Sequence, residues 1–135
     1  MSRDAQIWAN HLAASKKFEH DPIARGKDQG ENLYYVRPAN RLCDYGQQGA
    51  ECLSCGEIVQ VWYNEEADYD YNTGKAKTPF AVITHFTQLV WKATRELGMA
   101  TAVDTDNRLV AVARYSPVGN WGGEFKENVP PPENL

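Results

Sequence analysis

The chain has 135 residues, a length typical of one domain that buries a hydrophobic core without disulfides. Hydrophobic residues make up 42% and charged residues 24%, which excludes the disordered and membrane-embedded classes. The formal net charge of -4, with scattered basic residues, gives no basic patch for nucleic acid. We therefore expect one domain over residues 1–135, with no transmembrane segment, no secretory signal and no nucleic-acid partner.

The first elements in chain order are a helix and a loop. A helix is predicted from Ser2, as its N-cap, to about Lys17, with an apolar side that includes Ala5 and Leu12. The segment that follows, through Gly30, is rich in turn residues and contains His20. Residues 33–36 are aromatic and β-branched, which fits either a strand or a buried helical turn, and residues 38–49 are predicted to form a loop.

A second helix is predicted from about Cys52 to Tyr69. Ile58, Val61, Trp62 and Glu65 follow one another at helical spacing, which places Glu65 on the apolar face. A buried carboxylate without a partner would cost several kcal/mol, on the order of the desolvation penalty of an ion. Glu65 is thus expected to have a partner: a salt bridge or backbone cap, or else a metal, or a metal-bound histidine or water.

The last elements are a helix, a hairpin and a tail. After a tyrosine-rich, glycine-containing stretch over residues 70–79, a third helix is predicted to begin near Thr84 and to carry His85 in its first turn. Residues 97–103 and 108–115 are two β-rich runs joined by Asp104-Thr105-Asp106-Asn107, which is typical of a hairpin turn. The glycine- and proline-rich tail is predicted to be irregular.

Three cysteines lie close together, at positions 43, 52 and 55. An odd number excludes a closed disulfide framework, which leaves one local bridge with a free thiol or, as we favour, reduced cysteines. Three cysteines without an adjacent histidine also do not complete a structural zinc site.

Two histidines and two glutamates are the candidate site residues: His20, His85, Glu31 and Glu65. Imidazole and carboxylate are ligands that zinc and similar divalent ions prefer, although the spacing of these four matches no local metal signature. His11 is assigned an ordinary surface role. The chain has no G-x-S-x-G elbow and no glycine-rich phosphate loop, so serine hydrolase and nucleotide chemistry are disfavoured.

The segment His85-Phe86-Thr87-Gln88-Leu89-Val90-Trp91-Lys92-Ala93-Thr94 resembles the main signature of the CAP superfamily, which comprises cysteine-rich secretory, antigen 5 and pathogenesis-related proteins and is also called the SCP domain. Residues 30–33, 62–65 and 115–120 resemble further family motifs and come in family order. Typical secreted members have a cysteine just before the last motif, where this chain has Ala113-Arg114. Together with the sequence of residues 127–131, this makes the chain resemble the Golgi-associated plant pathogenesis-related branch.

This resemblance implies an α+β fold, a three-layer α-β-α sandwich with a central, mostly antiparallel sheet. It also implies that His20 and His85 bind Zn2+ or another divalent cation in a cleft lined by Glu31 and Glu65. Family members begin with an additional helix that has no counterpart here, so we expect an N-terminally truncated domain whose exposed apolar surface favours a homodimer.

Three functions follow from the resemblance. We favour a metal-binding module that acts by binding a lipid, either a sterol or an acidic phospholipid, or a protein partner. The first alternative is a zinc-dependent hydrolase in which Glu31 or Glu65 activates a metal-bound water. The second is an interaction scaffold with a vestigial cleft. An intracellular location, Golgi-associated or cytoplasmic, is favoured over secretion, which would require a signal on a longer N-terminus.

Overall fold

We analysed a computed structural model of the chain, which describes residues 1–39 and 54–132. Four α-helices, five strands and two 3-10 turns lie in these residues, in this order: α1 (Ser2–Ser15), a 3-10 turn (Arg25–Lys27), β1 (Gly30–Val36), α2 (Cys55–Tyr63), a 3-10 turn (Asn64–Asp68), β2 (Tyr69–Asp70), β3 (Lys75–Ala76), α3 (Thr84–Val90), β4 (Glu96–Val103), β5 (Leu109–Ser116) and α4 (Phe125–Asn128). Predicted features at Cys43, at Cys52 and over most of residues 38–49 lie outside the described residues.

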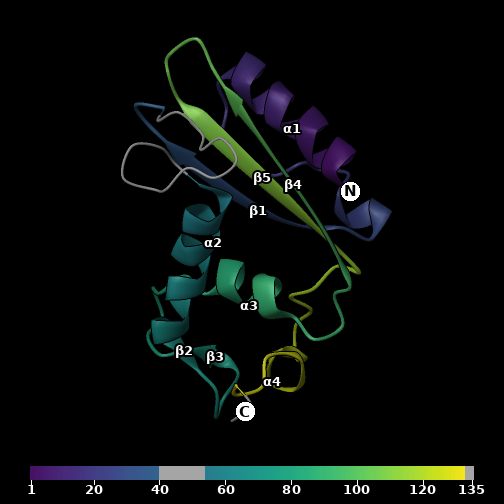
Figure 1. The fold of residues 1–135 in the computed structure, drawn as a ribbon. Coiled ribbons are helices and arrows are strands. Elements are labelled where there is room, and N and C mark those ends of the chain that lie inside the picture. The colour runs from purple at the N-terminus through teal and green to yellow at the C-terminus, as the bar shows by residue number, and fades with distance from the viewer. Residues whose placement is uncertain (40–53, 133–135) are drawn as a thin grey trace.

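The central layer is an antiparallel sheet with strand order β1-β5-β4. Helix α1 covers one face of this sheet, and α2 and α3 lie on the other side (Figure 1). Every residue of β5 from Leu109 to Tyr115 is buried, because this strand is central and both of its faces are covered. The predicted three-layer α-β-α sandwich is therefore confirmed, and its described sheet is wholly antiparallel.

Alternation along β5 divides the apolar residues between two cores. Val110 and Val112 face α1 and pack against Ala5, Ala9 and Leu12. Leu109, Ala111 and Ala113 face α2 and pack against Ile58 and Trp62. A third cluster, around Tyr69, Phe86 and Val129, joins α3 to the C-terminal segment.

The predicted first helix is confirmed, but its predicted N-cap is wrong. Ser2 is the first helical residue and Met1 occupies the N-cap position, where no side chain caps the helix. The serine hydroxyl is thus one position too late to act as the N-cap acceptor. The helix ends at Ser15 because Lys16 adopts a left-handed conformation with φ 61°.

The second helix is shorter than predicted, and this changes the interpretation of Glu65. Ser54 caps α2 in a capping box with Glu57, so the helix begins at Cys55, and it ends at Tyr63. Glu65 lies in the following 3-10 turn, and Val61 is 45% exposed. The predicted common helical face of Val61 and Glu65 is therefore wrong, because the tighter 3-10 turn rotates Glu65 away from the α-helical spacing.

The other elements agree with the sequence more closely. Residues 33–36 belong to a strand, β1, and not to a helical turn. The helix at Thr84 and the hairpin of β4 and β5 are confirmed. The tail forms one short helix, α4, and is anchored by Val129, which is 1% exposed. In the part of the chain described, no helix combines the length and apolar character needed to span a membrane.

Candidate functional site

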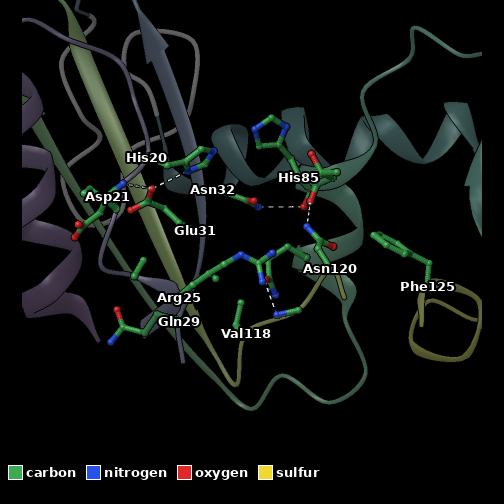
Figure 2. Close-up of a pocket in the computed structure, with 16 residues that line it drawn as sticks. His20, Asp21, Arg25, Gln29, Glu31, Asn32, His85, Val118, Asn120 and Phe125 are labelled. Carbon is green, nitrogen blue, oxygen red and sulfur yellow. Dashed lines mark hydrogen bonds and ion pairs between the residues drawn. The ribbon is translucent and has the colours of Figure 1, made fainter. Parts of the chain in front are cut away.

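A cavity of about 500 Å³ opens where the loop after α1, the start of β1, the start of α3 and the segment after β5 meet. Its lining includes His20, Arg25, Glu31, Asn32, His85 and Asn120 (Figure 2). Three of the four predicted site residues, His20, Glu31 and His85, therefore share one cavity. Glu65 does not line the cavity, but its carboxylate contacts the His85 ring.

His20 is held by a buried carboxylate of β1. Its Nδ1 lies 2.7 Å from Oε1 of Glu31, and the same oxygen accepts the backbone N–H of Asp21 at 3.0 Å. The Glu31 side chain is 4% exposed and the His20 side chain is 65% exposed. A fixed, buried acceptor therefore orients an imidazole that is open to solvent.

Arg114 of β5 holds the Glu31 carboxylate in place, a role that the sequence analysis did not predict. Glu31 and Arg114 are register partners on β1 and β5, which brings their side chains to one place on the sheet. The three nitrogens of the Arg114 guanidinium each donate one hydrogen bond: Nε to Oε2 of Glu31 at 2.8 Å, Nη2 to Oδ2 of Asp21 at 2.6 Å and Nη1 to the side-chain oxygen of Gln29 at 2.7 Å. Its side chain is 1% exposed, so both carboxylates have a buried cation as a partner.

His85 is held in a similar way by Glu65. Its Nδ1 lies 2.7 Å from Oε2 of Glu65, while Oε1 of the same carboxylate accepts the backbone N–H groups of His85 and Phe86, each at 3.0 Å. These bonds occupy free N–H groups of the first turn of α3, where an acceptor carboxylate is favourable. The imidazole also stacks on Trp62 of α2, with ring centroids 6.3 Å apart and 9° between the planes.

Helix α3 is fastened to the sheet through Asn32. The Asn32 amide donates to the backbone oxygen of His85 at 3.0 Å and lies 3.1 Å from the Tyr115 hydroxyl, to which it also donates. Burial raises the pKa of the Tyr115 phenol, so this hydroxyl stays neutral at physiological pH. Asn32 thereby fixes the position of His85 relative to β1 and to Glu31.

The opposite wall is fastened through Asn120 and Gln88. Asn120 has φ 59°, donates to the backbone oxygen of Thr84 at 2.9 Å and accepts the Thr87 hydroxyl at 2.6 Å. Gln88 accepts the backbone N–H of Gly119 at 2.9 Å. An added Cβ at Gly30 would overlap the Gln88 side chain, so glycine permits this close approach. Sequence reasoning included these residues in motifs without assigning them roles.

Two further predicted features lie elsewhere. His11 stacks on Trp8 in α1, with centroids 4.6 Å apart, and does not line the cavity. Cys55 is exposed at the start of α2. Within residues 1–39 and 54–132, no group of three or more histidine, cysteine or acidic side chains is arranged to hold a metal ion by itself.

Comparisons with known proteins agree with the motifs. The model of the CAP family, described as the cysteine-rich secretory protein family, matches residues 1–115. The chain is 33% identical over 136 residues to Golgi-associated plant pathogenesis-related protein 1 of Homo sapiens, covering 98% of this chain and 77% of that protein. It is 26% identical to venom allergen 5 of Polistes dominula, covering 92% of this chain but 51% of the allergen, so it spans about half the length of that relative.

Solved structures give the same result for the fold. The structure of BmVAL-1 superposes with a TM-score of 0.64 at 27% identity, covering 89% of this chain and 57% of that one. A crystal structure of NaASP2 with Zn2+ gives a TM-score of 0.59 at 24% identity, covering 87% of this chain and 59% of that one. The family predicted from the motifs is therefore confirmed: the chain belongs to the CAP family.

Proposed function

We propose that this chain is a metal-binding CAP module in which His20 and His85 hold a divalent cation, zinc being the best match to two imidazoles. One observation carries the proposal: each histidine that lines the cavity has its Nδ1 2.7 Å from a glutamate oxygen. A carboxylate at one ring nitrogen is the usual arrangement behind a metal-ligating histidine, because it fixes the tautomer and the ring orientation.

The donor set fits such an ion. When the Nδ1–H of a neutral imidazole donates a hydrogen bond to the glutamate, the free lone pair of the ring is on Nε2. Neither Nε2 atom has a hydrogen-bond partner among residues 1–39 and 54–132, so both nitrogens remain available as ligands. Two protein ligands leave open positions, and a bound ion would supply a Lewis acid there for a water molecule or a ligand group.

Binding is favoured over hydrolysis because each glutamate already accepts three hydrogen bonds from the protein. Glu31 accepts from His20, Asp21 and Arg114, and these bonds occupy both of its oxygens. Glu65 accepts from His85 and Phe86, again through both oxygens. A general base must have an oxygen within reach of the proton that it removes. We therefore assign Glu31 and Glu65 to orienting the histidines, with hydrolysis as the alternative.

The wider partners remain proposals that rest on family membership. A sterol, an acidic phospholipid or a protein partner is the proposed ligand class, and a homodimer is the proposed assembly. The similarity to a Golgi-associated protein supports a location at that organelle. A single domain over residues 1–135 is proposed as the folded unit.

Zinc titration by calorimetry at neutral pH tests the metal site. Wild type should bind with one saturable transition, and His20→Ala and His85→Ala should each lose it. His11→Ala is the matched control, because this histidine lies outside the cavity. Glu65→Gln should weaken zinc binding by roughly 10- to 100-fold, the usual effect of losing a carboxylate behind a ligating histidine. A folded wild type that binds no zinc, or variants that bind it unchanged, would refute the proposal.

A second measurement separates binding from hydrolysis. Zinc-loaded protein is incubated with fluorescently labelled casein and with a p-nitrophenyl ester, and product is followed over time. We expect no zinc-dependent turnover of either substrate. Turnover that disappears in Glu65→Gln or Glu31→Gln, at equal zinc content, would support the hydrolase alternative.

A further inference from the structure

Strand β4 forms one edge of the central sheet and is open to further pairing. It bonds to β5 on one side, and among residues 1–39 and 54–132 no strand lies on its other side (Figure 1). Residues 97–103 read Leu-Gly-Met-Ala-Thr-Ala-Val and contain no charged residue and no proline. Natural edge strands use charges, prolines and bulges to prevent pairing with another chain. The register of β4 with β5 is continuous, so β4 has none of these three devices over residues 97–103.

The backbone groups of the odd-numbered residues of β4 point toward the free edge. Asp104 donates its backbone N–H to the backbone oxygen of Arg108 at 2.9 Å, so the even-numbered residues are those that bond to β5. In agreement, the backbone oxygen of Thr101 accepts a hydrogen bond from the Gln6 side chain of α1 at 3.0 Å, outside the sheet. Within the described residues this is the one side-chain hydrogen bond to the edge groups of β4, and a partner strand would replace it.

Leu97 and Val103 form the uncovered apolar ends of β4. They are register partners of Tyr115 and Leu109, which pack in the second core, so their side chains point to the α2 side of the sheet. Helix α3, on that side, contacts β1 at the opposite edge. Leu97 and Val103 are consequently 56% exposed each, whereas α1 covers the other face of β4.

These two side chains are placed symmetrically about Ala100, at equal distances along the strand. When a second β4 pairs antiparallel with the first about a two-fold axis at Ala100, Leu97 of each copy lies opposite Val103 of the other. The same register places Met99 opposite Thr101, and these four odd-numbered residues are the ones whose backbone groups point to the edge. A shift by one residue would mismatch the backbone groups, and a larger shift would separate the apolar side chains. The edge is therefore complementary to a second copy of itself.

We propose that β4 is the interface of a two-fold homodimer, in which the β4 strands of two copies pair antiparallel about Ala100 and join two sheets into one. The inference rests on the homodimer named in the proposed function, to which it assigns a surface, and it does not depend on the metal site. The register brings Glu96 opposite Asp104, and Arg108 compensates this approach of two acids because it already pairs with Asp104 at 3.1 Å. The residues that line the histidine cavity do not belong to β4, so the dimer leaves that cavity open.

The association is measured by sedimentation velocity over a range of protein concentrations, in zinc-free buffer so that no metal bridges the copies. Wild type should form a dimer. Leu97→Asp and Val103→Lys should each weaken it by at least about tenfold, because each places an unpaired charge against an apolar side chain at two symmetric positions. Val82→Lys is the matched control, since Val82 is also 56% exposed but precedes α3, and it should dimerise like wild type.

The double variant Leu97→Asp, Val103→Lys tests the register. The carboxylate of each copy then lies opposite the ammonium group of the other, and the double variant should dimerise more tightly than either single variant. Within one chain the two positions are about 20 Å apart along the strand, so the recovery cannot come from a pair inside one copy.

Cysteine cross-linking tests the position of the two-fold axis, with Cys43, Cys52 and Cys55 replaced by serine. Ala100→Cys should form a disulfide between copies under mild oxidation, because residues opposite one another in a pair without backbone hydrogen bonds have Cα atoms about 4.5 Å apart. Ala102→Cys is the control. It lies on the same face of β4 but opposite Gly98 of the second copy, and it should not cross-link.

The outcomes separate this interface from the other proposals. A wild type that stays monomeric at every concentration would overturn both the interface and the homodimer, and it would leave the edge to a partner of another sequence. A dimer that Leu97→Asp and Val103→Lys leave unchanged, or that cross-links through Ala102→Cys as readily as through Ala100→Cys, would overturn the β4 interface and leave the homodimer. None of these results bears on zinc binding, which the calorimetric titration tests separately.

Discussion

Replacing Arg114 by methionine tests how the site is held together. The change keeps most of the side-chain stem but removes the cation that bonds to Asp21 at 2.6 Å and to Glu31 at 2.8 Å. The side chains of these partners are 13% and 4% exposed, so solvent screens the lost interactions weakly. Removing one partner of a buried ion pair costs about 3–5 kcal/mol, because the remaining charge is left uncompensated. This is a large part of a typical unfolding free energy of about 5–15 kcal/mol.

The loss is measured by urea unfolding followed by tryptophan fluorescence, with linear extrapolation to water. Arg114→Lys is a milder variant that keeps the charge and loses the fork, and it should fall between wild type and Arg114→Met. In the triple variant Arg114→Met, Asp21→Asn, Glu31→Gln the uncompensated charges are gone, and we expect it to recover more than half of the loss. A cost below about 1 kcal/mol for Arg114→Met, the scale of an exposed pair, would show that the network is not a buried one. No recovery in the triple variant would show that the loss has another cause.

Two further predictions concern the elements that support the site. Ser54→Ala removes the oxygen that accepts the backbone N–H of Glu57 at 3.1 Å. It should lower the free energy of unfolding, measured in urea, by about 1 kcal/mol. Glu57→Gln keeps the capping box and should lower it by less. The Asp104 carboxylate accepts the backbone N–H of Arg108, which lowers its pKa below the usual range. Its stabilising effect is therefore full above the usual pKa of about 3.9 and is lost as pH falls through the lower folded value. The difference in stability between wild type and Asp104→Asn should shrink below about pH 4, and a constant difference would contradict this assignment.

Sequence reasoning located the elements better than it located individual side chains. The first helix, the helix at Thr84 and the hairpin follow from apolar spacing and turn residues, which depend on neighbours in the chain. Glu65 shows the limit of such reasoning. Its spacing to Ile58 and Trp62 predicted a common helical face, but α2 ends at Tyr63 and Glu65 follows in a 3-10 turn. The inference that Glu65 has a partner was sound, because it rested on the cost of an unpaired carboxylate and not on the period of the helix.

The pairing of Glu31 with Arg114 could not be predicted from periodicity because it depends on strand register. Glu31 and Arg114 are 83 residues apart and meet only because β1 pairs with β5. A signal was nevertheless present. Arg114 is the one charged residue in the stretch 109–115, which otherwise consists of apolar residues and one tyrosine. A cation within such a strand needs acids nearby, which predicts buried acidic partners for Arg114 without saying where in the chain they lie.

The difference in exposure between His20 and Glu31 is the strongest reason to regard this pair as a ligand site. A hydrogen bond to an imidazole that is 65% exposed contributes little to folding, because water can replace the partner. Yet the glutamate that makes this bond is buried and fixed by Arg114, an arrangement whose desolvation cost is high. Holding a solvent-exposed imidazole in one orientation therefore has a reason other than stability. His85 is weaker evidence, since its ring packs on Trp62 and is 29% exposed. His20→Ala should consequently leave the unfolding free energy nearly unchanged while it abolishes zinc binding, a separation that a purely structural histidine would not show.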